Sequence, residues 1–207
     1  MALVKYNNNS ISAVTSAASV PSGAMTLIKE QTASSSATIS FVHGTSDVVL
    51  DSTYPIYVFK FINIHPASNA DFTVNFRDGG SAYDATKTTT FFHAQSNEAG
   101  NYSDLSYQAG NDVAQGTGSA TVARQIGTGN DESCSGELTL FNPSSTTFVK
   151  HFISRAFAYQ YIGAQYNSDN YGAGYCNVTA AIDGVQFAMS SGNIDAGTIK
   201  LYGLKDS

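Results

Sequence analysis

Four tyrosines are the side chains whose type and position best suit contact with a ligand or another subunit. They fall in two polar segments rich in Asn, Gly, Ser and Asp. Residues 95–117 are predicted to form a long loop or a pair of very short strands, and residues 165–172 are predicted to form a loop. The four are Tyr102, Tyr107, Tyr166 and Tyr171. A tyrosine ring can stack on a sugar ring, and tyrosine is also enriched in subunit interfaces. Because no residue pattern indicates a cleft, we favour an interface and keep a carbohydrate site as the alternative.

The other reactive side chains occupy positions that strand and turn chemistry explains. The histidines His43, His65, His93 and His151 form no H-x-H or H-x-x-x-H pair, and a metal site needs at least three converging ligands. They are expected to be ordinary sheet-edge or inter-subunit histidines. Most aspartates fall in turns, where the carboxylate accepts backbone hydrogen bonds. The sequence has no nucleophile elbow, no phosphate-binding loop and no Trp to line a glycosidase cleft. We therefore predict no catalytic residue, no metal and no cofactor.

Charge is sparse and slightly acidic. The 207 residues carry a net charge of -6, and charged residues make up 13% of the chain, about half of the usual roughly 25%. No cluster of Lys and Arg exists that could neutralise phosphates, which argues against a nucleic-acid partner. A weakly charged polar surface can pack against copies of itself with little desolvation of charge. The composition therefore favours an assembled protein.

No segment resembles a signal peptide or a membrane span. The first ten residues, MALVKYNNNS, contain no apolar stretch of the kind a signal peptide needs, and no apolar run approaches about 18 residues. The two cysteines, Cys134 and Cys176, have no metal-binding spacing. A disulfide between them is possible from the sequence, but two free, buried thiols are the simpler interpretation.

Short alternating segments, separated by turn residues every 8–12 positions or so, predict about ten strands. Residues 56–64 form the strongest expected strand, apolar on both faces and therefore central or at a subunit contact. The connection over residues 66–70 is expected to be a hairpin to the strand at 71–76. In the last strand Ile199 and Leu201 should point inward, and Gly197 should allow a close backbone approach or a bulge before them. The other expected strands lie at 37–42, 88–94, 136–141, 147–154, 156–162, 173–181 and 185–189.

The expected fold class is all-β, an antiparallel jelly-roll-like β-sandwich. Residues 25–207 would form this single domain. Residues 1–24, with many small side chains, would form an extended N-terminal arm that anchors the domain to a larger assembly.

Several segments resemble those of a family of tailed-bacteriophage virion proteins, found especially among phages of marine bacteria. The ending FAMSSGNIDAGTIKLYG at residues 187–203 carries the resemblance most strongly. YVFKFINIHP at residues 57–66, FNPSS at 141–145 and ALVKYNNNSI at 2–11 are also similar to that family. The resemblance implies a virion structural role as a fibre, spike, adaptor or head-decoration subunit, and it implies no catalytic residues.

The leading hypothesis is therefore a non-enzymatic bacteriophage structural protein, located in the virion and acting through oligomeric assembly. Its expected partners are copies of itself, as a trimer or ring, and other virion proteins. The alternative is a host-receptor or carbohydrate-binding module at a fibre tip, where the four tyrosines would contact a host surface glycan. A third hypothesis, a polysaccharide depolymerase, lacks a recognisable carboxylate pair.

Overall fold

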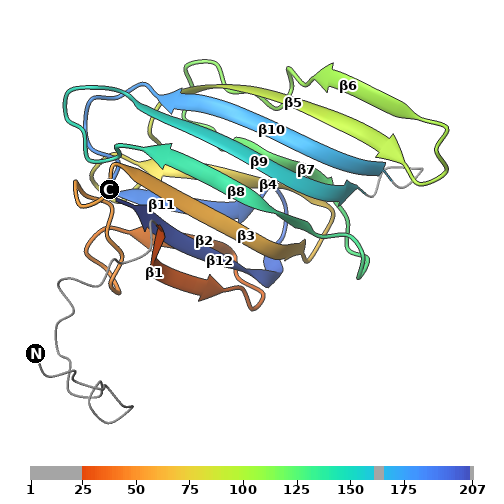
Figure 1. The fold of residues 1–207 in the computed structure, drawn as a ribbon, viewed down its shortest axis with the longest axis horizontal. Coiled ribbons are helices and arrows are strands. Elements are labelled where there is room, and N and C mark those ends of the chain that lie inside the picture. The colour runs from red at the N-terminus through yellow and green to blue at the C-terminus, as the bar shows by residue number, and fades with distance from the viewer. Residues whose placement is uncertain (1–24, 161–165, 206–207) are drawn as a thin grey trace, which may run out of the picture.

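The computed structural model describes residues 25–160 and 166–205, and within them the chain forms twelve antiparallel strands (Figure 1). The predicted arm, residues 1–24, lies outside the described residues. The strands in chain order are β1 (Met25–Thr32), β2 (Thr38–Val42), β3 (Ile56–Pro66), β4 (Ala70–Arg77), β5 (Lys87–Asn97), β6 (Ser103–Tyr107), β7 (Ala120–Ile126), β8 (Cys134–Phe141), β9 (Lys150–Gln160), β10 (Tyr166–Cys176), β11 (Gly184–Met189) and β12 (Ile194–Leu204). Within the described ranges, no helix has the length and apolar character needed to cross a membrane.

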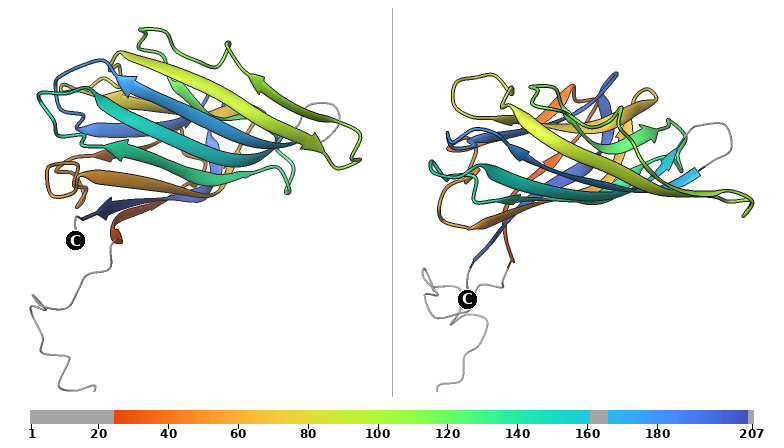
Figure 2. Two further views of the ribbon diagram at one scale, coloured as in Figure 1. Left: turned by 45° about the horizontal axis from the view of Figure 1, so that its top comes forward. Right: turned by 90° about the horizontal axis from the view of Figure 1, so that it is seen from above.

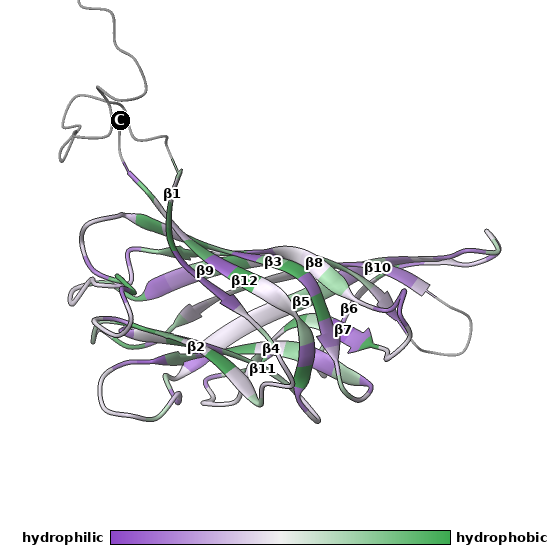
Figure 3. Ribbon diagram, turned by 90° about the horizontal axis from the view of Figure 1, so that it is seen from below, coloured by the Kyte–Doolittle hydropathy of each residue, from purple (hydrophilic) through white to green (hydrophobic). Residues whose placement is uncertain are grey.

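The strands form two stacked layers (Figures 2 and 3). Eight strands pair in the order β1-β12-β3-β8-β9-β10-β5-β6, and we call this layer the front sheet. The other four pair in the order β2-β11-β4-β7 and form the back sheet. One residue pair, Ile126 of β7 opposite Gln160 of β9, joins the layers along one side. The front sheet is therefore wider than the back sheet.

The order of the strands is that of a jelly roll. The quartets β1-β12-β3-β8 and β2-β11-β4-β7 face each other, and the chain crosses between them at β1–β2, β2–β3, β3–β4, β7–β8 and β11–β12. The remaining strands, β5, β6, β9 and β10, extend the front sheet beyond this framework. The predicted all-β antiparallel sandwich of the jelly-roll kind is confirmed.

Two predicted connections are wrong. Residues 66–70 do not close a hairpin, because β3 pairs with β12 and β8 whereas β4 pairs with β11 and β7 in the other sheet. Residues 165–172 do not form a loop, because β10 begins at Tyr166 and pairs along its whole length with β5 and β9.

One strand was predicted as two. Two separate strands were expected at 147–154 and 156–162, but β9 runs unbroken from Lys150 to Gln160.

An aromatic cluster joins the two sheets. The Phe187 ring of β11 packs edge-to-face against Phe59 and Phe61 of β3, with centroid distances of 5.3 and 5.2 Å. It stacks on Phe72 of β4 at 5.6 Å and meets Phe41 of β2 at 6.4 Å. All five side chains are almost fully buried. Offset and edge-to-face pairs add to the free energy gained from burying apolar area.

Removal of the Phe187 ring should therefore lower the stability of the whole domain. We expect Phe187→Ala to lower the free energy of unfolding by about 3–5 kcal/mol, because it leaves a cavity between the sheets. Phe148→Ala is the matched control, since Phe148 is 70% exposed and its loss should change stability by less than about 0.5 kcal/mol. Urea unfolding followed by circular dichroism measures both, and equal effects would contradict the role of the cluster.

Gly197 allows β12 to bulge towards β3, as the sequence predicted. The pairing register shifts between Ala196 and Thr198, and Gly197 has a φ of 115°. A Cβ at this position would lie 2.6 Å from the carbonyl oxygen of Asn63. A side chain would meet both a backbone clash and an unfavourable φ.

We therefore expect Gly197→Ala to destabilise the protein by about 1–3 kcal/mol. Gly110→Ala provides the comparison, because no heavy atom lies within 4 Å of a Cβ built there. Thermal unfolding of the two variants should separate them clearly, and a Gly197→Ala variant as stable as Gly110→Ala would contradict this account of the bulge.

The two cysteines are free and buried, which confirms the simpler interpretation of the sequence. Burial raises the pKa of the Cys176 thiol to about 12, and it raises the pKa of Cys134 as well. Both sulfurs are therefore protonated at neutral pH and act as small apolar groups.

Two lysines are also buried, which the sequence did not indicate. Lys87 and Lys150 have no exposed surface, and the strand register places both opposite Cys176. Burial lowers the pKa of both ammonium groups. The ammonium groups donate to backbone carbonyls of adjoining loops: Lys87 to Thr117 and Gly118, and Lys150 to Ser145, Val178 and Ala180. These lysines fix the loops at one end of the extended part of the front sheet.

Candidate functional site: an open sheet face and a polar hollow

The outer side of the front sheet is not covered by any other described element, and we call it the open face. One ladder of side chains crosses it, with a residue from each of the eight strands in direct cross-strand register. In order from β6 to β1, the ladder is Tyr107, Phe92, Tyr171, Arg155, Glu137, Lys60, Lys200 and Glu30. Directly opposite residues on one sheet face are close enough to interact.

The aromatic half of the ladder is ordered by stacking. The rings of Phe92 and Tyr171 are 4.8 Å apart and parallel within 2°. The Arg155 guanidinium lies 5.0 Å from the centroid of the Tyr171 ring and donates to both oxygens of Asp169, at 3.0 and 2.6 Å. The Tyr171 hydroxyl also donates to Asp169, at 2.9 Å. The hydrogen bond from Arg155 is the largest cause that holds the pKa of Asp169 below its usual range, and the hydrogen bond from Tyr171 adds to it.

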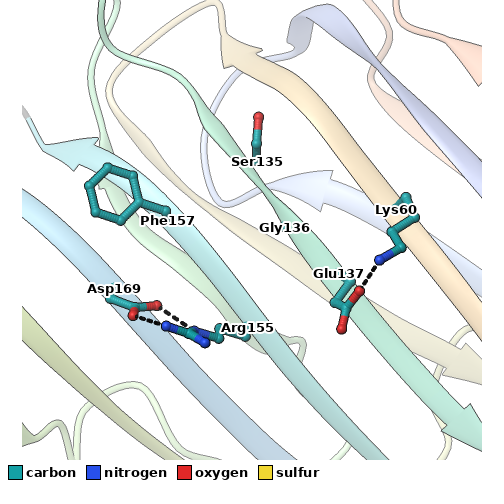
Figure 4. Close-up of a pocket in the computed structure, with 7 residues that line it drawn as sticks. All are labelled: Lys60, Ser135, Gly136, Glu137, Arg155, Phe157 and Asp169. Atoms are coloured by element: carbon teal, nitrogen blue, oxygen red, sulfur yellow. Dashed lines mark hydrogen bonds and ion pairs between the residues drawn. The ribbon is translucent and has the colours of Figure 1, made fainter.

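Several shallow hollows interrupt the open face. The first, of about 400 Å³, is lined by the ion pairs Lys60–Glu137 and Arg155–Asp169 together with Phe157 (Figure 4). The second, of about 360 Å³, has a mainly apolar lining of Thr88, Thr89, Thr90, His151, Phe152, Ile153, Ala173, Gly174 and Tyr175. Neither resembles an enclosed catalytic pocket, because both lie on an open sheet surface.

Large apolar side chains project from the same face into solvent. Leu105 is 71% exposed, Ile153 55%, Phe157 54% and Tyr107 54%. All four lie in the extended part of the front sheet, on β6 and on β9, with β5 and β10 between these two strands. Apolar side chains gathered in this way typically mark a surface that is covered in an assembly.

The four predicted tyrosines divide between the two sides of the front sheet. Tyr107 and Tyr171 flank Phe92 on the open face. Tyr166 lies opposite Asn97, and Tyr102 accepts a hydrogen bond from the Asn97 backbone, which places both on the inner side. The rings of Tyr102 and Tyr166 are in contact, with centroids 4.9 Å apart.

The inner pair of tyrosines borders a separate hollow, of about 280 Å³, which we call the polar hollow. It is lined by His93, Gln95, Tyr102, Asp104, Gln108, Arg124, Gln125, Gln160 and Tyr166. The sequence suggested only the two tyrosines of this set. The others were missed because their inward direction follows from the pairing of β5, β6, β9 and β10, and β7 itself was not predicted.

A bulge in β7 orients the cation of the polar hollow. The register of β7 against β4 shifts twice near Phe72, so that Val122 and Ala123 are both buried, and the Arg124 side chain donates to Gln108. The next residue, Gln125, has a φ of 53°, and its backbone N–H donates to Asp71 Oδ1 at 2.8 Å. Bulges of this kind redirect side chains at binding sites.

Among the described residues, no three His, Cys, Asp or Glu side chains gather closely enough to hold a metal ion. Comparisons with protein-family models, with curated proteins and with solved structures found no match to this chain. The chemistry of these two surfaces is therefore the basis for inferring function.

His93 should make stability depend on pH. Burial and the nearby Arg124 lower the pKa of His93 from 6.5, so the folded chain holds this imidazole neutral. Below about pH 6.5 the unfolded chain binds a proton that the folded chain does not, so the free energy of unfolding should fall as pH falls. We expect His93→Gln to reduce this decline between about pH 7.5 and 5.5. Urea titrations across that range test the expectation, and identical slopes for both proteins would contradict it.

Proposed function

We propose that the chain is a non-enzymatic structural subunit of a bacteriophage particle and that its open face packs against further copies of itself. The observation that carries the proposal is the set of exposed apolar side chains on that face, Leu105, Tyr107, Ile153 and Phe157. Covering them would remove apolar area from water, which is the main favourable term in association. Jelly rolls recur in viral capsid and lectin domains, so this fold is suited to such a role.

The charges on the open face favour a second copy as the occupant. The positive and negative charges of the ladder, together with Asp169, cancel. Three cations, Arg155, Lys60 and Lys200, are matched by three carboxylates, Asp169, Glu137 and Glu30. A face with no net charge meets no overall repulsion from its own copy. Most of these groups are already paired within the subunit, so covering them leaves few charges unpartnered.

The segments that resemble phage virion proteins are joined in the fold. Residues 57–66 form most of β3 and residues 187–203 include most of β12, and these two strands pair with each other. Met25 lies opposite Leu204 across the β1–β12 ladder, so residues 1–24 join the sandwich at the same end as the last described residues. We propose that this N-terminal segment attaches the subunit to another virion protein.

Charge introduced on the open face should disrupt self-association. We expect Ile153→Asp and Phe157→Asp each to weaken association of the purified chain by at least about tenfold, because a carboxylate would replace a buried apolar contact. Thr38→Asp is the matched control, since Thr38 is exposed on β2 of the back sheet and introduces the same charge away from the open face. Sedimentation velocity over a concentration series measures the effect. A wild-type chain that remains monomeric throughout would contradict assembly through this face.

Removal of residues 1–20 should leave the domain folded but prevent its incorporation into phage particles. The described core begins at Met25, so we expect the shortened chain to keep the circular dichroism spectrum and unfolding midpoint of the full chain. It should no longer enter particles during infection by a phage that supplies only this variant. Mass spectrometry of purified particles provides the measurement. Full-length chain absent from the particles would contradict the virion role, and incorporation of the shortened chain would contradict the anchor.

A further inference from the structure

Three buried hydrogen-bond donors of the polar hollow have no partner among the described residues. They are His93 Nδ1, Arg124 Nε and Gln160 Nε2, and they are the complete set of such buried side-chain atoms in residues 25–160 and 166–205. His93 is 2% exposed and Gln160 is fully buried. Unpaired buried polar groups are costly, and their concentration in one hollow indicates a ligand that supplies acceptors.

The hydrogen bonds around Gln108 show that His93 Nδ1 is a donor. Arg124 Nη1 can only donate, and it lies 2.7 Å from Gln108 Oε1, which fixes the orientation of the Gln108 amide. Gln108 Nε2 then donates to Ser106 at 2.8 Å and to His93 Nε2 at 3.0 Å. Because Nε2 accepts, the proton of the neutral imidazole is on Nδ1, the ring nitrogen that has no partner among the described residues.

The remaining groups of the hollow add acceptors and an apolar platform. Asp104 is the carboxylate in the lining and Arg124 the cation, so the hollow has no net charge while His93 is neutral. Asp104 accepts a hydrogen bond from Ser106, and neither Asp104 nor Arg124 forms an ion pair within the described residues. The contacting rings of Tyr102 and Tyr166 form the aromatic border.

These features match the chemistry of a sugar ring. A sugar hydroxyl both accepts and donates, so adjacent hydroxyls can pair with fixed donors and with a carboxylate at the same time. The C–H face of the ring can pack against an aromatic side chain. A volume of about 280 Å³ is at the lower end of the roughly 300–1,000 Å³ typical of small-molecule sites, which suits a short saccharide.

We propose that the polar hollow binds a neutral saccharide. Its hydroxyls accept hydrogen bonds from His93 Nδ1, Arg124 Nε and Gln160 Nε2 and donate to Asp104, while one ring packs against Tyr102 and Tyr166. The hollow lies on the inner side of the front sheet, opposite the open face. This site is therefore separate from the proposed assembly surface and goes beyond the structural role.

Saturation-transfer NMR on the full chain tests the proposal. The probes are the methyl glycosides of glucose, mannose and galactose, with methyl glucuronide as the acidic counterpart. We expect saturation transfer to at least one neutral glycoside and weaker transfer to the glucuronide. Asp104→Ala should weaken that binding by at least about tenfold, the effect of losing a charge-assisted hydrogen bond. Arg124→Lys should do the same, because it keeps the charge but removes Nε.

Two control variants separate this site from other surfaces. Asp112→Ala removes a partly buried carboxylate that accepts from Tyr107 outside the hollow and should leave binding unchanged. Ile153→Asp alters the open face and should also bind as wild type, even where it abolishes self-association. Absence of transfer to all neutral glycosides, preference for the glucuronide, or undiminished binding by a folded Asp104→Ala variant would each overturn the proposal.

Discussion

The packing of Phe187 between the two sheets is the interaction on which the rest of the structure depends. Its ring touches Phe59 and Phe61 of the front sheet and Phe41 and Phe72 of the back sheet, so one side chain links strands from both layers. The chain crosses between the layers repeatedly, and each crossing is stable only while the inner faces remain buried against each other. The jelly-roll framework therefore supplies the rigid body that carries every other feature.

The unequal width of the two sheets explains where the functional surfaces lie. Strands β5, β6, β9 and β10 extend the front sheet beyond the framework, and β7 is the nearest strand of the back sheet. Under this extension the buried residues include His93, Ser154, Gln160, Ser168 and Asn170 in place of a continuous apolar core. The inner side is thus polar and hollowed, while the outer side carries the exposed apolar residues. One structural extension produces both a candidate binding site and a candidate assembly surface.

The framework strands were predictable because their inward residues are apolar. Ile39 and Phe41, and likewise Ile199 and Leu201, alternate with polar residues and are buried as expected. The first half of β10 was not predictable, because its inward residues include Ser168, Asn170 and Gly172 and give no contrast with the outward ones. Strand β7 was missed because its bulge breaks the period of two. Tyr102 and Tyr166 were identified within the candidate site, but their polar neighbours came from strands whose pairing the sequence did not reveal.

The sequence by itself determined the all-β class, the sparse charge and the inward residues of the jelly-roll strands, since alternation of apolar and polar residues is a local property. It also indicated tyrosines as contact residues. Only the tertiary structure decided that these tyrosines occupy two opposite sides of one sheet. The convergence of His93, Arg124 and Gln160 likewise depended on tertiary structure, because it requires the register of β5, β7 and β9. Long-range register depends on which strands become neighbours, and the local pattern of a polar strand does not specify its neighbours.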